Sequence, residues 1–271
     1  MKQYNTVLTI AGSDSGGGAG IQADLKTFSA CGCYGMSVIT AITAQNTQGV
    51  FDISPVPLST IEKQIDAVMK DIGAQAVKVG MLHSSEVIEL VAKKVQQYQI
   101  KNLVIDPVMV ATSGDKLLQD EAIQALQEIL LPLARIITPN IPEAEILLRQ
   151  RLTTQSELPE AAARLSLNDT VSVLLKAGHL SDEKLVDVFY NAESKNQIFL
   201  ESQRISTLNT HGTGCTLSSA IASFLALDKP LEQAVGKGKD YISSAIQAGK
   251  DFKLGQGHGP VHHFYNLWRN L

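Results

Sequence analysis

The sequence predicts a three-layer α/β/α fold, in which a central and mostly parallel sheet is flanked by helices and carries a small antiparallel hairpin at its edge. Short apolar segments rich in β-branched residues alternate with segments whose apolar residues recur every three or four positions. Strands buried on both faces and separated by amphipathic helices are typical of a parallel sheet covered on each side. The chain of 271 residues is 44% apolar and has no charged or Pro/Gly-rich linker, so we expect one domain over residues 1–271.

The segments expected to be strands are short, apolar and rich in β-branched residues. They cover residues 6–10, 36–43, 76–80, 103–108, 135–139 and 172–176. The segments between them that carry apolar residues at helical spacing cover residues 61–72, 85–98 and 121–130.

The last third of the chain departs from this alternation. Apolar segments 185–190 and 197–202 flank a polar turn, which is typical of a hairpin, so antiparallel strands are expected at one edge of the sheet. Beyond them we expect helices over 216–228 and 230–249, and a helical terminal segment around 262–271.

Charge and cysteine content exclude several classes of protein. The 23 Lys and Arg residues and 27 Asp and Glu residues give a net charge of −4, which offers no general electrostatic reason to bind nucleic acid. Cys31, Cys33 and Cys215 fit neither a disulfide framework nor a zinc site. No apolar segment reaches the roughly 18–20 residues that span a bilayer, so we expect a cytoplasmic protein without membrane or nucleic-acid partners.

The glycine-rich segment 11–20, AGSDSGGGAG, follows the first expected strand. Gly18 stands where a Walker A loop needs its lysine, and no register supplies the G-x-G-x-x-G of a dinucleotide site. Two interpretations stay open: a tight turn before a helix, or a loop that faces a ligand at a strand end, with Asp14 and Asp24 nearby.

A better anion site lies at residues 210–219, THGTGCTLSS, which open an apolar helix. Gly212 and Gly214 permit a tight turn whose backbone N–H groups face a ligand, and the helix dipole favours negative charge there. Cys215 falls in the first helical turn, where a thiol can have a lowered pKa and act as a base. The alternative is a small buried cysteine in an ordinary helix start.

Further polar residues follow other expected strands. Asn140 and Glu143 are three apart and can present two oxygen ligands to a magnesium ion. Asp106 can serve the same site or cap a turn before Pro107, and Lys176 can meet a phosphate or be solvated. Together with the amide-rich turn, this set indicates phosphoryl transfer with Mg–ATP.

Several motifs in this order along the chain resemble the hydroxymethylpyrimidine/phosphomethylpyrimidine kinase family of thiamine biosynthesis, within the ribokinase-like superfamily. They are GSDSGGGAGIQADLKTF (12–28), TAQNTQGV (43–50), KVGML (78–82), IDPVMVATSGDKLL (105–118), TPNIPEAE (138–145), HGTGCTLSSAIA (211–222) and GHGPVHHF (257–264). The resemblance implies a kinase that phosphorylates 4-amino-5-hydroxymethyl-2-methylpyrimidine and then its monophosphate, with ATP as co-substrate and Mg²⁺ as cofactor. It also suggests a homodimer.

The resemblance assigns roles to individual residues. Gly212, Thr213 and Gly214 would form the anion hole for the transferring phosphoryl group, with Cys215 as the base for the substrate hydroxyl. The implied metal and phosphate residues are Asn140, Glu143, Asp106, Lys176 and Thr210. The implied pyrimidine-binding residues are Gln45, Gly12, Asp24, Met81 and Val108. An amide suits this ring, because Gln45 offers both a donor and an acceptor to an aminopyrimidine that presents the same pair.

The chain departs from the family pattern in the loop after Val108. Thr112 stands where the family often has lysine, and Ala111 stands where a pyridoxal-phosphorylating subgroup has a second cysteine. Pyridoxal kinase is nevertheless the nearest rival activity, and a non-catalytic vitamin-binding relative is the rival from another class. His258, His262 and His263 flank a Gly-Pro turn that suits a loop better than a metal site.

Overall fold

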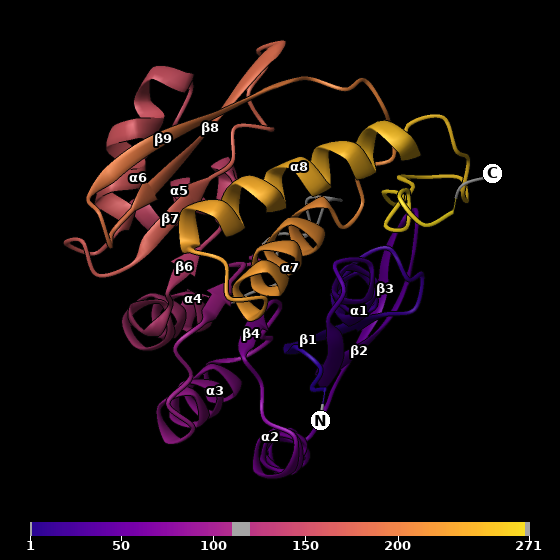
Figure 1. The fold of residues 1–271 in the computed structure, drawn as a ribbon, viewed down its shortest axis with the longest axis vertical. Helices are drawn as coiled ribbons and strands as arrows, with labels where there is room; N and C mark the ends of the chain where they lie inside the picture. The colour runs from indigo at the N-terminus through magenta and orange to yellow at the C-terminus, as the bar shows by residue number, and fades with distance from the viewer. Residues whose placement is uncertain (1, 110–119, 269–271) are drawn as a thin grey trace.

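The computed structural model describes residues 2–109 and 120–268, and within them nine strands form one sheet in the order β3-β2-β1-β4-β5-β6-β7-β8-β9 (Figure 1). The strands are β1 (Thr6–Asp14), β2 (Tyr34–Asn46), β3 (Gly49–Pro55), β4 (Ala76–Val79), β5 (Leu103–Ile105), β6 (Ile136–Ile137), β7 (Ser172–Leu175), β8 (Lys184–Asn191) and β9 (Asn196–Gln203).

The six central strands, β2 to β7 in sheet order, pair in parallel, as the alternating pattern predicts. Strands β4 to β7 are buried along their whole length. β5 and β6 are shorter than expected, because Pro107 and Pro139 follow soon after and remove ladder donors. The residues beyond the shortened strands therefore project from the carboxyl edge of the sheet.

Both edges of the sheet are antiparallel. The predicted hairpin is confirmed as β8 and β9, with β8 antiparallel to β7. β3, antiparallel to β2 at the other edge, was not expected. Most of β3 is exposed, so its sequence lacks the buried apolar pattern that marks the central strands.

Helices cover both faces of the sheet. Within the described residues they are α1 (Gly20–Ala30), α2 (Leu58–Asp71), α3 (Ser85–Gln97), α4 (Asp120–Ala125), α5 (Ile141–Leu148), α6 (Leu158–Leu165), α7 (Thr213–Ala226) and α8 (Leu231–Gly249). Side chains of α1, α7 and α8 build the core on one face, and those of α2 to α6 build the core on the other. α7 and α8 lie side by side across the sheet (Figure 1).

Two expected helices differ from the structure. The helix predicted over 121–130 changes to a π-helix at Leu126–Leu130 and a 3-10 turn at Leu131–Leu133, which contains Pro132. The prediction of a helix around 262–271 is wrong for the described part, where residues 263–267 form turns. The His262 N–H donates to Ala245 O, so the segment is tied to α8 before it has the length for a stable helix.

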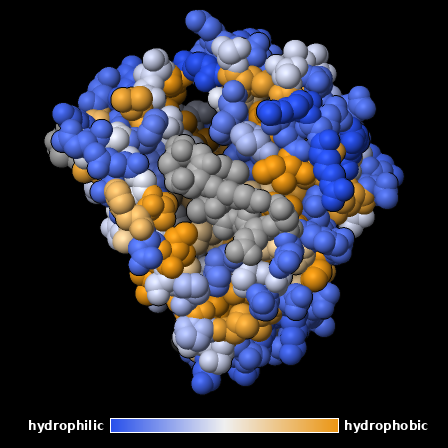
Figure 2. Space-filling view, turned by 180° about the vertical axis from the view of Figure 1, so that it is seen from behind, coloured by the Kyte–Doolittle hydropathy of each residue, from blue (hydrophilic) through white to orange (hydrophobic). Residues whose placement is uncertain are grey.

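The surface facing away from the viewer of Figure 1 is mostly hydrophilic, with apolar residues in separate patches (Figure 2). Across residues 2–109 and 120–268 we find no helix with both the length and the apolar character needed to cross a bilayer.

Candidate active site

A cavity of about 630 Å³ lies at the carboxyl ends of the parallel strands. In open α/β sheets this edge is where ligands bind. Every site residue expected from the sequence lines this cavity except Asp24: Gly12, Gln45, Met81, Asp106, Val108, Asn140, Glu143, Lys176, Thr210, Gly212, Thr213, Gly214 and Cys215.

The GTGC turn, residues 212–215, forms the start of α7. Gly212 is the N-cap and has a φ of 78°, in the left-handed region, and a Cβ at this position would lie 1.8 Å from the Gly18 carbonyl oxygen. The Thr216 N–H donates to Gly212 O and begins the helical bonding. The amides of Gly214 and Cys215 precede that first bond, so they are free to bind an anion at the helix N-terminus.

Asp106 and Lys176 lie against this turn. Lys176 Nζ is 3.0 Å from Asp106 Oδ1, and Thr138 Oγ1 donates to the same oxygen at 3.0 Å. A Cβ at Gly214 would lie 3.1 Å from Asp106 Oδ2 and 3.5 Å from Lys176 Nζ. A phosphate bound at the turn would therefore meet both the lysine and the carboxylate.

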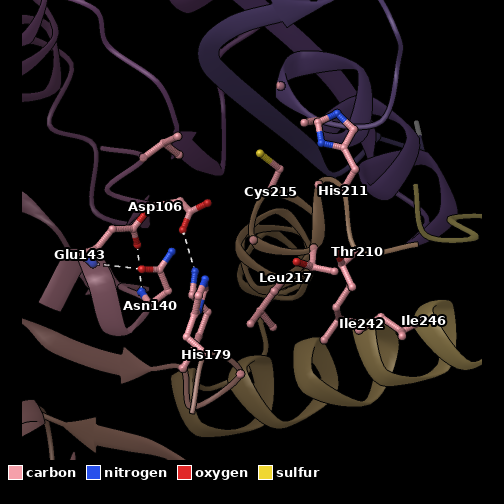
Figure 3. Close-up of a pocket in the computed structure, with 18 of the residues that line it drawn as sticks. Asp106, Asn140, Glu143, His179, Thr210, His211, Cys215, Leu217, Ile242 and Ile246 are labelled. Carbon is pink, nitrogen blue, oxygen red and sulfur yellow. Dashed lines mark hydrogen bonds and ion pairs between the residues drawn. The ribbon is translucent and has the colours of Figure 1, made fainter. Parts of the chain in front are cut away.

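Asn140 and Glu143 form a capping box at the start of α5. Asn140 Oδ1 accepts from the Glu143 N–H at 3.0 Å, and the Asn140 N–H donates to Glu143 Oε2 at 2.8 Å (Figure 3). This is a structural role that the Asn-x-x-Glu spacing also predicts. Burial raises the pKa of Glu143 to about 8 and Asp106 raises it further, against the opposing effect of Lys176.

The residues around Glu143 fit a divalent cation. Two carboxylates, Asp106 and Glu143, share one neighbouring lysine, and both are almost fully buried. A cation would offset the cost of ionising Glu143 there, and carboxylate oxygens are ligands that Mg²⁺ prefers. In the part of the chain that the structure describes, no group of three or more His, Cys, Asp or Glu side chains could hold a metal alone.

The glycine-rich segment closes on one of its own side chains. The Asp14 carboxylate accepts hydrogen bonds from the amides of Gly16, Gly18 and Ala19, at 2.8, 3.0 and 2.8 Å. The turn therefore binds an internal anion where a phosphate loop binds nucleotide. Before the turn, Gly12 lines the cavity, and a Cβ there would lie 2.6 Å from Met81 Cε.

Gln45 lies at the same end of the cavity as Gly12, on β2. Ser15 fixes its backbone through two hydrogen bonds, donating to Gln45 O at 2.8 Å and accepting from the Gln45 N–H at 2.9 Å. The side-chain amide lines the cavity with Met81 and Val108. The segment thus serves both interpretations left open by its sequence, as a tight turn and as a cavity wall.

The prediction that Asp24 lines the pocket is wrong. Its side chain is fully buried in α1 behind the cavity wall, and Lys78 Nζ lies 3.0 Å from each of its carboxylate oxygens. Thr9 and Ser219 donate to the same carboxylate at 2.6 and 2.7 Å. Lys78 itself lines the cavity, so the sequence motif contains the pair but not its order from the cavity inward.

The expectation of a lowered pKa for the Cys215 thiol is also wrong. Burial raises its pKa to about 11, and this effect outweighs the nearby positive charge of Lys78, which lowers it. Cys215 points into the cavity from the start of α7 (Figure 3).

Sequence reasoning missed a second group of cavity residues. Leu217 on α7 and Ile242 and Ile246 on α8 give one end an apolar wall near Thr210 (Figure 3). Asp187 on β8 and Lys239 on α8 pair there at 2.6 Å. Their spacing reads as ordinary helix and strand packing, so only the fold brings them to the site. Ala111 and Thr112 lie outside the described residues.

The fold and this arrangement define the class of the protein as a small-molecule kinase: an amide turn at a helix start, a lysine and two carboxylates meet at one point of a cavity with an apolar end. The particular family follows from comparison with known sequences. The model of the phosphomethylpyrimidine kinase family matches residues 14–262, and the chain belongs to this family.

Relatives over the whole length agree with this assignment. A hydroxymethylpyrimidine/phosphomethylpyrimidine kinase of Rhizobium meliloti (strain 1021) is 48% identical over 97% of this chain and 98% of its own length. The structure of phosphomethylpyrimidine kinase from Clostridium difficile 630 has a TM-score of 0.78 at 48% identity, covering 89% of this chain and 99% of that one. An ADP complex of Bacillus subtilis pyridoxal kinase has a TM-score of 0.90 at 40% identity, covering 98% and 100%.

Proposed function

We propose that this protein is an ATP-dependent kinase that phosphorylates 4-amino-5-hydroxymethyl-2-methylpyrimidine and then its monophosphate. The observation that carries the proposal is the contact of Gly214 with both Asp106 and Lys176, which joins the GTGC turn to the charged residues in one cavity. Membership of the phosphomethylpyrimidine kinase family supports the choice of substrate.

In this proposal the nucleotide lies at the apolar end of the cavity, between α7 and α8, with its phosphates directed to the GTGC turn. The substrate hydroxyl oxygen attacks the γ-phosphorus, the bond to the ADP oxygen breaks, and the hydroxyl proton must leave. The amides of Gly214 and Cys215 stabilise the charge that develops on the transferring group. Cys215 Sγ is the candidate acceptor for the proton, and Lys78 beneath it favours the thiolate.

Mg²⁺ would be held by Glu143 and Asp106, with Asn140 orienting Glu143 through the capping box. When bound, the metal would neutralise phosphate charge during transfer. Lys176 supplies the protein's own positive charge at the same point.

At the other end of the cavity, Gln45 would hydrogen-bond the aminopyrimidine edge, with Met81 and Val108 against the ring. Gln45→Ala should raise the KM for the pyrimidine alcohol by about tenfold or more, because a buried ring edge loses its hydrogen bonds. The KM for ATP should stay unchanged. An unchanged pyrimidine KM would remove Gln45 from the substrate site.

Pyridoxal kinase is the second candidate, and the TM-score of 0.90 to the B. subtilis enzyme favours keeping it in the test. Steady-state rates on the pyrimidine alcohol and on pyridoxal, under the same Mg–ATP, separate the two activities. We expect the larger kcat/KM for the pyrimidine. A larger value for pyridoxal would replace the proposal by its rival.

We further propose a homodimer formed through the β3 edge. Phe51 and Ile53 on β3 and Ile42 on β2 are 67%, 37% and 56% exposed, an unusual grouping of large apolar side chains on a sheet edge. Ile53 also lines the substrate end of the cavity. Light scattering on the purified protein at micromolar concentration should give twice the mass of 29.2 kDa, and a monomer would contradict this.

A further inference from the structure

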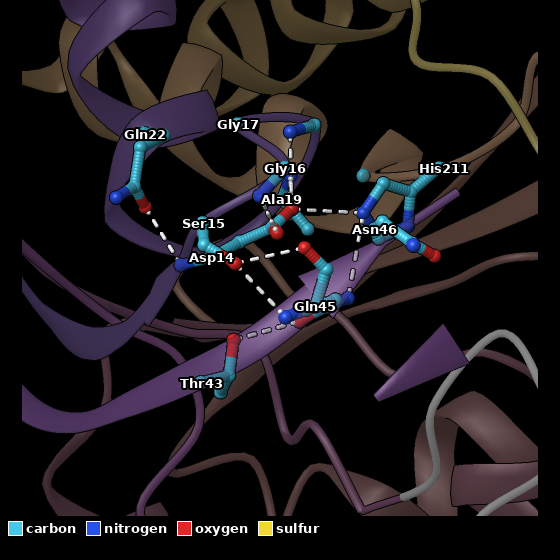
Figure 4. A network of polar contacts seen from close by, with 12 residues as sticks. Asp14, Ser15, Gly16, Gly17, Ala19, Gln22, Thr43, Gln45, Asn46 and His211 are labelled. Atoms are coloured by element: carbon cyan, nitrogen blue, oxygen red, sulfur yellow. Dashed lines mark hydrogen bonds and ion pairs between the residues drawn. The ribbon is translucent and has the colours of Figure 1, made fainter. Parts of the chain in front are cut away.

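The ring of His211 stands between the internal anion Asp14 and the side chain of Gln45 (Figure 4). His211 Nε2 lies 2.9 Å from Asp14 Oδ2 and 3.5 Å from Gln45 Nε2. Its backbone leads directly into Gly212, the N-cap of α7. One imidazole nitrogen therefore faces the substrate amide from the side of the GTGC turn.

The hydrogen on this nitrogen can be assigned from its partners. Burial would raise the pKa of Asp14, but hydrogen bonds from His211 and the Ala19 and Gly16 amides outweigh burial and hold it below its usual value. An ionised carboxylate only accepts, so His211 Nε2 must carry a hydrogen and donate it to Asp14. A nitrogen that donates there cannot also accept from the Gln45 amide.

The other end of the Gln45 amide has the same conflict. Thr43 Oγ1 lies 2.9 Å from Ser13 O and 3.2 Å from Gln45 Oε1, and both of these oxygens need the single hydroxyl hydrogen. Exchanging the amide oxygen and nitrogen removes both conflicts. The oxygen then faces the His211 N–H, and the nitrogen donates to Thr43 Oγ1 while Thr43 donates to Ser13 O.

This order determines what the substrate meets, and the next step rests on the proposed function. The anchored amide keeps one N–H and one oxygen lone pair for the cavity, with the oxygen on the His211 side. A 4-aminopyrimidine then places its amino group on that side and its ring nitrogen toward the N–H. The hydroxymethyl group is attached next to the amino-bearing carbon, so it falls on the side of the GTGC turn.

We propose that His211 is a positioning residue: its Nε2–H, held by Asp14, fixes the order of donor and acceptor that Gln45 presents and so directs the substrate hydroxymethyl group toward Cys215. Gly18 provides the space for the ring, because a Cβ there would lie 2.3 Å from His211 Cδ2 and 3.2 Å from the Pro260 side chain. This explains why glycine stands at position 18 of the glycine-rich segment.

The kinetic test uses His211→Phe, which keeps a planar ring and removes the hydrogen. We expect kcat/KM for the pyrimidine alcohol to fall by about 10- to 100-fold, as for loss of a strong hydrogen bond, with the KM for ATP within about twofold of wild type. His211→Gln, which retains a donor, should recover most of the loss. His258→Phe, at an exposed histidine outside the cavity, is the matched control.

Gly18→Ala tests the same position without changing the imidazole. It should lower the pyrimidine kcat/KM as His211→Phe does, whereas Gly236→Ala, where a Cβ meets nothing within 4 Å, should not. A purely structural role for His211 would move the ATP and pyrimidine constants together. Unchanged pyrimidine kinetics in His211→Phe would overturn the proposal.

A second measurement does not depend on activity. In ¹⁵N-histidine-labelled protein, the Nε2 signal absent from His211→Gln should have the chemical shift of a protonated nitrogen. An unprotonated Nε2 would overturn the proposal even if the kinetics changed. A wild-type enzyme that phosphorylates no pyrimidine alcohol would instead refute the proposed function, and the ¹⁵N spectrum would still decide the hydrogen on His211.

Discussion

Lys78→Met is the sharpest test of how the cavity floor is stabilised. The side chains of Lys78 and Asp24 are both 0% exposed, and the ammonium lies 3.0 Å from each carboxylate oxygen. The substitution keeps a long apolar side chain and leaves the Asp24 carboxylate with only its hydroxyl donors among the described residues, Thr9 and Ser219.

Removing one partner of a buried ion pair costs about 3–5 kcal/mol, because a buried charge is left without its counterion. The two hydroxyl donors remain, so we expect the lower part of that range, about 3 kcal/mol. This is a large share of the total, since domains unfold with about 5–15 kcal/mol. The matched control is Lys70→Met, whose exposed pair with Asp66 should contribute less than about 1 kcal/mol.

Equilibrium unfolding in urea, followed by circular dichroism, measures both free energies. The double variant Lys78→Met/Asp24→Asn should be more stable than Lys78→Met alone, because no unpaired charge remains. A loss below about 1 kcal/mol for Lys78→Met would refute the reasoning, because it would mean that the buried pair is worth no more than a surface pair. A double variant less stable than Lys78→Met would refute it as well.

Three further predictions concern the GTGC turn. Cys215→Ala should lower kcat by about 10²- to 10⁴-fold, as for loss of a general base, and leave pyrimidine binding by calorimetry intact; wild-type turnover would remove Cys215 from proton transfer. In the ligand-free enzyme, alkylation of Cys215 by iodoacetamide, located by mass spectrometry, should rise about tenfold per pH unit through pH 10, because only the thiolate reacts and the pKa is about 11. A plateau near pH 8.5, the ordinary midpoint, would contradict that pKa. Gly212→Ala should abolish most turnover and lower the melting temperature, because a Cβ would overlap the Gly18 carbonyl at a left-handed φ; a variant as active and stable as Gly236→Ala would show that the turn tolerates side chains.

The central sheet could be predicted from the sequence because its strands are buried on both faces. Segments such as 76–80 and 172–176 are continuous apolar runs, and this signal is local. β3 gave no such signal, since its side chains are mostly exposed and its position depends on pairing with β2. The segment 262–271 has apolar residues without a helix because contacts to α8 determine its path.

The cavity could be predicted where its residues follow strand ends or open a helix, as Asp106 and Gly212 do. The sequence could not order Asp24 and Lys78 from the cavity inward, because both belong to recognisable motifs and only packing decides which one is covered. The direction of the Cys215 pKa also depended on burial, which opposed the effect expected from the helix terminus. His211 was adjacent to the predicted turn, yet its partner Asp14 lies 197 residues away in sequence.

The central claim is that one cavity phosphorylates a pyrimidine alcohol and then its monophosphate. The most direct measurement is ³¹P NMR of a single reaction that contains the enzyme, Mg–ATP, the pyrimidine alcohol and an equal concentration of pyridoxal. The account predicts that the pyrimidine monophosphate appears first and is converted to the diphosphate, with little pyridoxal phosphate. A reaction that yields pyridoxal phosphate and leaves the pyrimidine unphosphorylated would contradict it.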